Sequence, residues 1–145
     1  MVGGPVRRCY FDSSAVVKLV GDEAFTDDVA RWVDDPRVEA VTGRLTETEV
    51  RRAVERDGST QEIATAVLER FDVYEHPTWE FRAAGTIPGR SLRSLDAIHI
   101  AAAIRVEADA IISYDERMIE AAAAMGLPAI QPGVDEGGIR RIPAE

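Results

Sequence analysis

Four acidic residues stand beside apolar segments in separate parts of the chain: Asp12, Glu49, Asp96 and Asp115. Carboxylates that gather without neutralising partners raise one another's pKa unless a cation lies between them. Oxygen ligands without cysteine or clustered histidine favour hard cations, so this cation would be Mg²⁺ or Mn²⁺ and not zinc. Such an ion can activate a water molecule as a nucleophile and stabilise charge in a transition state.

The segments around these acids predict alternating strands and helices. Short continuous apolar runs with β-branched residues, such as 7–11 and 109–113, are typical of parallel strands covered on both faces. We therefore expect an α/β fold, a three-layer α/β/α sandwich with a central parallel sheet. Ligands bind beyond the carboxyl ends of the strands in such sheets. The four acids would then meet at one edge of the sheet.

The expected elements cover most of the 145 residues. The expected strands are 7–11, 38–43, 71–77, 109–113 and 127–131, and the expected helices are 15–20, 25–33, 45–56, 60–70, 77–84, 95–106 and 116–125. No repeat or linker divides the sequence, so we expect one domain over 1–132. The glycine-rich and proline-containing segment 133–145 is expected to be a flexible C-terminal tail.

Each acid also has a purely structural interpretation. Asp12 and Asp115 could cap the helices that follow them, Asp96 could complement a helix dipole, and Glu49 could be a solvated surface acid. Ser13 and Ser14 could bond a ligand carboxylate or cap a helix, and we favour Ser14 as a cap. We also expect Ser94 to cap the helix that carries Asp96. It is the joint pattern of the four acids that favours a site.

Composition gives further limits. The formal charge of −9 argues weakly against nucleic-acid binding, since phosphate contacts need Lys and Arg. No apolar run approaches the roughly 18 residues of a membrane helix, and no signal peptide precedes the first strand, so we expect a cytoplasmic protein without membrane contact. The single cysteine, Cys9, is expected to be a buried packing residue.

Four stretches of sequence resemble the successive motifs of the PIN-domain family, in particular its VapC-type toxin ribonucleases: "CYFDSSAVVKLV", "TETEVRRAV", "SLDAIHIAAAI" and "IISYDERM". The resemblance runs from about residue 7 to 131. It implies a metal-dependent endoribonuclease that leaves a 5′ phosphate and a 3′ hydroxyl. It also implies a partner antitoxin that occupies the site.

The resemblance assigns roles to the four acids. Asp12 and Asp96 would bind the Mg²⁺ or Mn²⁺ ion directly, Asp115 would be a ligand or an anchor, and Glu49 would be a ligand or would orient the water. Glu47 competes with Glu49 for the second motif. We prefer Glu49, because the sequence "EVRRA" begins with it.

An RNA substrate requires positive charge on this acidic chain. Six arginines flank the candidate acids: Arg44, Arg51, Arg52, Arg56, Arg90 and Arg93. They could line the phosphate path or be solvated, and we single out Arg52 and Arg93, with Ser13 and Ser113, as substrate contacts.

Other features concern packing and partners. We expect His99, three residues after Asp96, to be a packed, hydrogen-bonded residue and not a ligand. The alanine-rich segment 95–106 is compatible with a homodimer. An acidic protein would also attract a basic antitoxin at long range.

Two further functions remain open. The fold could serve another PIN-type nuclease, in ribosomal RNA processing or DNA flap cleavage, but the compact length favours the toxin. The domain could instead bind a divalent ion or a phosphorylated partner without catalysis, as receiver domains do. Receiver domains carry a late lysine, and no lysine follows Lys18 here.

Overall fold

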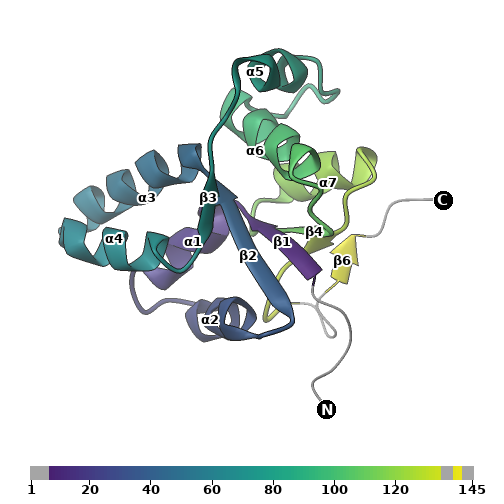
Figure 1. Cartoon of the computed structure of the whole chain (residues 1–145). Helices are drawn as coiled ribbons and strands as arrows, with labels where there is room; N and C mark the ends of the chain where they lie inside the picture. The colour runs from purple at the N-terminus through teal and green to yellow at the C-terminus, as the bar shows by residue number, and fades with distance from the viewer. Residues whose placement is uncertain (1–6, 135–138, 142–145) are drawn as a thin grey trace.

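Six short strands form one sheet: β1 (Arg7–Phe11), β2 (Val38–Gly43), β3 (Asp72–Tyr74), β4 (Ala110–Ile112), β5 (Ala129–Ile130) and β6 (Ile139–Arg141). This computed structural model describes residues 7–134 and 139–141. The strand order is β3-β2-β1-β4-β5-β6 (Figure 1). The first five strands are parallel, and β6 pairs antiparallel with β5.

Helices cover both faces of the sheet. They are α1 (Ser13–Val16), the 3₁₀ turn η1 (Val17–Leu19), α2 (Thr26–Asp34), α3 (Arg44–Asp57), α4 (Gln61–Leu68), α5 (Thr78–Gly85), α6 (Ser94–Arg105) and α7 (Glu116–Ala124). Helices α1 to α4 lie on one side, and α6 and α7 on the other (Figure 1). Helix α5 packs on α6 through a small alanine cluster. The expected three-layer α/β/α sandwich is confirmed.

Alternation along the buried strands builds two cores. Successive side chains of a strand point to opposite faces. Cys9 and Phe11 accordingly pack against α1 to α4, whereas Tyr10 packs against α6 and α7. Cys9 is fully buried, as expected, and burial raises the pKa of its thiol to about 12. This thiol is therefore a packing group.

The strand order reverses between β1 and β4. From β1 the chain proceeds to β2 and β3 on one side, while β4 and β5 lie on the other. Ligand sites of open parallel sheets lie beyond the carboxyl ends of the strands at such a reversal. Asp12 and Ser113 directly follow β1 and β4. The fold therefore brings the first and last acidic motifs to the expected edge.

Several local expectations are wrong. The helix expected at 15–20 begins earlier and continues as the 3₁₀ turn η1. Helix α6 begins at Ser94 itself, with Arg93 as its N-cap and no side-chain cap bond. The expected flexible tail at 133–145 stays a prediction: strand β6 lies within it, and 135–138 and 142–145 lie outside the described residues. Among the described helices, none has the length and apolar character needed to span a membrane.

Candidate active site

Asp12 follows β1 and is the N-cap of α1. Its Oδ1 accepts hydrogen bonds from Ala15 N at 3.1 Å and from Ser14 Oγ at 2.6 Å. Only 1% of the residue is exposed, and this burial raises the pKa of Asp12; the opposing influence of His99 and of the hydroxyl hydrogen bonds is smaller. The structure thus makes Asp12 a helix cap, and the cap that we expected of Ser14 is wrong, because Ser14 donates to Asp12.

Ser14 Oγ also joins the turn after β1 to the turn after β4. It accepts a hydrogen bond from Tyr114 N at 2.9 Å and lies 3.4 Å from Ser113 Oγ. Ser113 Oγ accepts one from Asp115 N at 3.0 Å. The Asp115 carboxylate caps α7 by accepting a bond from Arg117 N at 2.9 Å. These bonds fix the acids that follow β1 and β4 at one edge of the sheet.

Glu49 projects from the second turn of α3 toward α1 and α6. Its Oε2 accepts a hydrogen bond from Ser13 Oγ at 2.9 Å, and its Oε1 lies 2.7 Å from His99 Nε2. Burial favours a raised pKa for Glu49, but the hydrogen bonds from His99 and Ser13 outweigh it and hold this pKa below its usual value. Glu49 is therefore an ionised, firmly oriented carboxylate at neutral pH.

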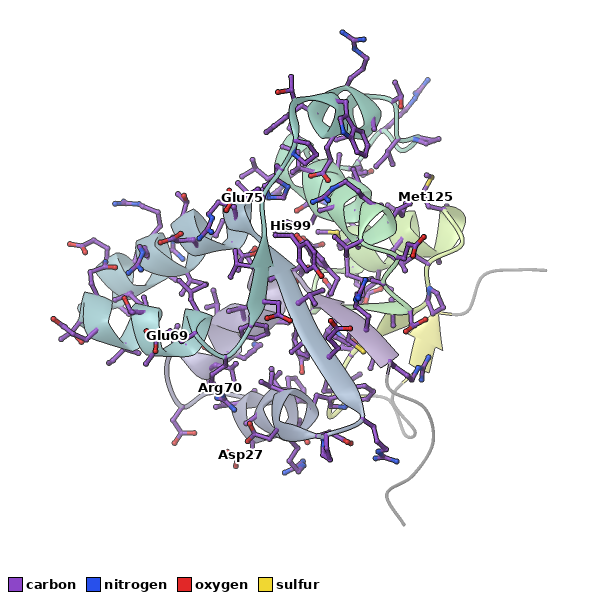
Figure 2. All side chains as sticks on the ribbon, in the orientation of Figure 1. Asp27, Glu69, Arg70, Glu75, His99 and Met125 are labelled. Carbon is purple, nitrogen blue, oxygen red and sulfur yellow. The ribbon has the colours of Figure 1, made fainter. Side chains whose placement is uncertain are left out.

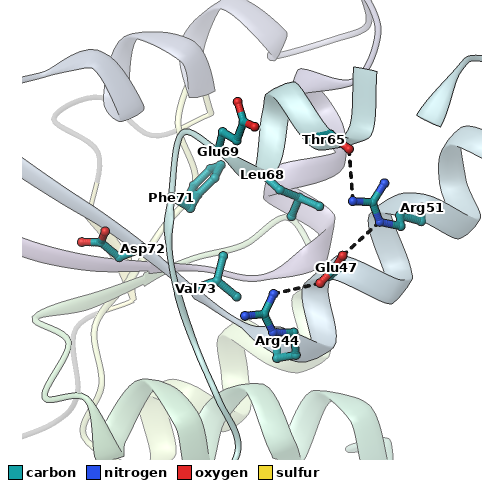
Figure 3. A pocket seen from close by; sticks show the side chains of 9 residues that line it. All are labelled: Arg44, Glu47, Arg51, Thr65, Leu68, Glu69, Phe71, Asp72 and Val73. Atoms are coloured by element: carbon teal, nitrogen blue, oxygen red, sulfur yellow. Dashed lines mark hydrogen bonds and ion pairs between the residues drawn. The ribbon is translucent and has the colours of Figure 1, made fainter. Parts of the chain in front are cut away.

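Glu47, the competing acid of the second motif, faces a different pocket (Figure 3). It pairs with Arg44 at 2.8 Å and with Arg51 at 3.1 Å. This pocket of about 370 Å³ lies between α3, α4 and β3. Glu47 is therefore separated from Ser13 and His99. Two of the six candidate arginines, Arg44 and Arg51, form ion pairs with it.

Asp96, in the first turn of α6, is the acid with an unmet electrostatic requirement. Within the described part of the chain, its Oδ2 is a buried side-chain oxygen without a hydrogen-bond partner. Burial raises the pKa of Asp96, and the charges of Asp115 and Glu49 raise it further. Arg93 and His99 lower it in part. This carboxylate would be stabilised by an additional cation.

The donor set fits a hard divalent ion, although its members are not assembled around one point. Among residues 7–134 and 139–141, no three Asp, Glu, His or Cys side chains lie close enough together to hold a metal ion. The unpartnered Asp96 oxygen, in a carboxyl group whose pKa is raised by burial and by neighbouring acids, nevertheless favours an added positive charge. The oxygen-only donors suit Mg²⁺ or Mn²⁺.

His99 is a packed and hydrogen-bonded residue, as expected. It is fully buried between α6 and the sheet (Figure 2). Its Nδ1 lies 2.8 Å from the Tyr10 hydroxyl, while its Nε2 contacts Glu49. We did not foresee a role for Tyr10. The alternation of β1, which points Tyr10 toward α6 and not toward α1, was the signal that could have revealed it.

A groove of about 500 Å³ runs beside Glu49, lined by Ser13, Ser14, Lys18, Arg52, Arg56 and Leu95 among others. Arg52 and Arg56 are exposed and form no ion pair within the described residues. Arg93 is exposed at the start of α6 and interacts with Asp96. These arginines lie near the acids. Ser113, which we expected to contact the substrate, is fully buried, and its Oγ accepts a hydrogen bond from Asp115 N.

The sequence matches the PIN domain family over residues 9–124. It is 37% identical over 131 residues to "Ribonuclease VapC35" of Mycobacterium tuberculosis, covering 86% of this chain and 96% of the relative. It is 34% identical over 126 residues to "Ribonuclease VapC46" of the same organism, covering 85% of this chain and 96% of the relative.

Solved structures show the same fold. The crystal structure of Mycobacterium tuberculosis VapC20, described as a Sarcin-Ricin loop cleaving toxin, superposes with a TM-score of 0.65 at 17% identity, covering 78% of this chain and 94% of VapC20. A Pyrobaculum aerophilum protein gives a TM-score of 0.57 at 22% identity, covering 80% and 79% of the two chains. The chain therefore belongs to the PIN domain family, among its VapC proteins.

Proposed function

We propose that this protein is a Mg²⁺- or Mn²⁺-dependent endoribonuclease toxin that cleaves RNA and is neutralised by a cognate antitoxin. The observation that carries the proposal is the unpartnered, buried Oδ2 of Asp96, in a carboxylate whose pKa neighbouring acids raise. Such an oxygen accepts a hydrogen bond, a proton or a cation, and the nearby acids favour positive charge. The ribonuclease names of its VapC relatives support RNA as the substrate.

The three aspartates would hold the ion, and Glu49 would act on the water. Bound to Asp12, Asp96 and Asp115, the ion would supply positive charge that activates the attacking water and stabilises the transition state. Glu49 is held by Ser13 and His99 and is ionised, so it can accept a hydrogen bond from this water and orient it for in-line attack.

The reaction hydrolyses one phosphodiester bond. The water oxygen forms a bond to phosphorus, the bond from phosphorus to the 3′ oxygen breaks, and a proton passes to that oxygen. The products are a 5′ phosphate and a 3′ hydroxyl. Arg52 and Arg93 would bind flanking phosphates of the RNA, and Ser13 would line its path beside Glu49.

The partners follow from charge and family. An acidic protein, with a formal charge of −9, attracts a basic antitoxin. We propose that a polar group of this antitoxin enters the carboxylate site, that the toxin forms a homodimer, and that it acts in the cytoplasm. The coverage of 96% of VapC35 favours the toxin over a larger RNA-processing nuclease.

The test is cleavage of total RNA by the purified protein with and without Mn²⁺, beside an Asp96→Asn variant whose circular dichroism spectrum matches the wild type. We expect cleavage by the wild type only when Mn²⁺ is present, and loss of at least about 100-fold in the variant. Equal cleavage by both proteins would eliminate the metal mechanism.

A further inference from the structure

A second buried polar cluster lies outside the acid site. It joins His76, which follows β3, to Glu80 on α5 and Arg105 on α6. Glu80 is fully buried, and only 8% of the His76 side chain is exposed. His76 Nδ1 lies 2.5 Å from Glu80 Oε2, and Arg105 Nε donates to Glu80 Oε1. The Glu80 charge is thus compensated within the cluster.

The other ring nitrogen of His76 caps helix α3. Its Nε2 accepts a hydrogen bond from Leu45 N at 3.0 Å. Since Nε2 accepts, the ring proton is on Nδ1, where it is donated to Glu80. The first N–H groups of a helix need partners from outside it. His76, from 31 residues away in sequence, supplies one for α3.

The residue at the N-cap of α3, Gly43, cannot supply this partner. It has no side chain, and a Cβ built there would lie 2.5 Å from His76 Cε1 and 2.6 Å from the Tyr10 hydroxyl. The imidazole therefore occupies the place of an ordinary capping side chain. The same Tyr10 hydroxyl contacts His99, which in turn holds Glu49. His76 therefore contacts the first turn of α3, and His99 contacts its second turn through Glu49.

We propose that His76 is a positioning residue of the candidate active site. Its neutral imidazole ties the first turn of α3 to α5 and, through Glu80 and Arg105, to α6. Helix α3 carries Glu49 and α6 carries Asp96, so the cluster sets how these two acids stand relative to each other. This inference rests on the proposed function, in which Glu49 orients the water.

The charge state of His76 controls the cap. A proton on Nε2 would place two N–H groups against each other and remove the acceptor of Leu45. The charged groups that face the ring are Glu80 of α5, Arg105 of α6 and the positive N-terminus of α3. The other groups near the ring include the Tyr10 hydroxyl of β1, the Phe81 ring of α5 and the exposed Arg44–Glu75 ion pair. Protonation of His76 should therefore loosen the first turn of α3.

The test begins with the Leu45 amide in the full chain, followed by hydrogen exchange in NMR spectra. In His76→Ala we expect its exchange, relative to the wild type, to accelerate about fivefold or more. In His76→Gln, whose side-chain oxygen can accept the bond, most protection should return. The wild type should also lose this protection at the pH where its His76 signals report protonation, and the Gln variant should not. Thr78→Ala, an exposed neighbour, is the matched control.

A double-mutant cycle then connects the cap to Glu49. His76→Ala should lower kcat for RNA cleavage with little change in KM, and this loss should largely vanish in a Glu49→Gln background, where residual cleavage is measured in single turnover. An equal loss in both backgrounds, or an unchanged Leu45 amide in an active enzyme, would overturn the role of His76. A wild type without ribonuclease activity would instead overturn the proposed function, while the exchange data would still report on the cap.

Discussion

His99 joins Tyr10 to Glu49 through both nitrogens of its buried ring. The Tyr10 hydroxyl lies 2.8 Å from Nδ1, and Glu49 Oε1 lies 2.7 Å from Nε2. Burial raises the pKa of Tyr10, so its hydroxyl keeps its proton and can donate a hydrogen bond to Nδ1 when the His99 ring is neutral. The Nε2 proton is then directed at the carboxylate. A hydroxyl on β1 thereby fixes both the tautomer and the rotamer of the residue that holds Glu49.

Removing the Tyr10 hydroxyl should weaken the orientation of the Glu49 carboxylate while leaving that carboxylate in place. In Tyr10→Phe, His99 Nδ1 loses its donor in a buried setting, and we expect the free energy of unfolding to fall by about 1 to 3 kcal/mol. RNA cleavage should fall roughly threefold to tenfold at saturating substrate, because Glu49 is less well oriented. Denaturant unfolding and cleavage rates check both values. Tyr74→Phe is the matched control. Within residues 7–134 the Tyr74 hydroxyl forms no hydrogen bond, so this change should alter neither value.

Divalent ions should stabilise the wild type through Asp96. At an ion concentration about 100 times its Kd, binding adds about 2.7 kcal/mol, which corresponds to a rise in Tm of roughly 5 to 10 °C. In Asp96→Asn this rise should be largely lost, because the neutral amide cannot provide the charge. Calorimetry with Mg²⁺, Mn²⁺ and EDTA measures the shift. An equal rise in both proteins would place the ion elsewhere.

Without metal, Asp96 should oppose folding at neutral pH. Its pKa is raised in the folded protein, so its favourable contribution is fully present below about pH 4, the ordinary aspartate value, and is lost as the pH rises through the raised pKa. As the pH rises, the unfolding free energy of the wild type should therefore fall relative to that of Asp96→Asn. Urea titrations in EDTA between pH 4 and 8 would refute this if the difference stayed constant.

The arginines of α3 should divide into two functional groups. Arg52 lines the groove beside Glu49 without an ion-pair partner in the described chain, whereas Arg51 pairs with Glu47 at 3.1 Å. Arg52→Gln should weaken RNA binding at all sequences and reduce the slope of log K against log salt by about 0.7. Arg51→Gln is the matched control and should leave that slope unchanged. Binding is measured in Ca²⁺ or with inactive Asp96→Asn.

Sequence reasoning succeeded where one rule fixed the position of a residue. Alternation and strand ends predicted the sheet, and the parallel-sheet rule brought Asp12 and Asp115 to one edge. It failed where a polar side chain had to choose a distant partner. Ser14 bonds Asp12 and a turn 100 residues away, and neither partner is apparent from local capping preferences.

The same limit applies to His76 and to β6. The bond from Leu45 to His76 depends on the pairing of β2 with β3, which brings residue 76 against the start of α3. Strand β6 spans three residues and pairs with an edge of only two, Ala129 and Ile130. So short a ladder has no periodicity that a sequence pattern could reveal.

Gly43 should be intolerant of a side chain for a steric reason. The Cβ of Gly43→Ala would meet His76 and the Tyr10 hydroxyl at 2.5 and 2.6 Å, and moving either group breaks a buried hydrogen bond. We expect a loss of about 1 to 3 kcal/mol in unfolding free energy, together with reduced RNA cleavage. Gly85→Ala, at the end of α5 with open space around it, should be neutral or slightly stabilising.

The cause of the Gly43 effect can be separated from a general loss of helix formation. If the clash with the imidazole dominates, combining Gly43→Ala with His76→Ala should cost less than the sum of the two single changes, because the shortened residue 76 leaves room for the new methyl group. Additive losses in denaturant unfolding would show that the methyl group acts through the backbone of α3 instead. The sign of this coupling thus tests whether Gly43 is needed to admit the capping histidine.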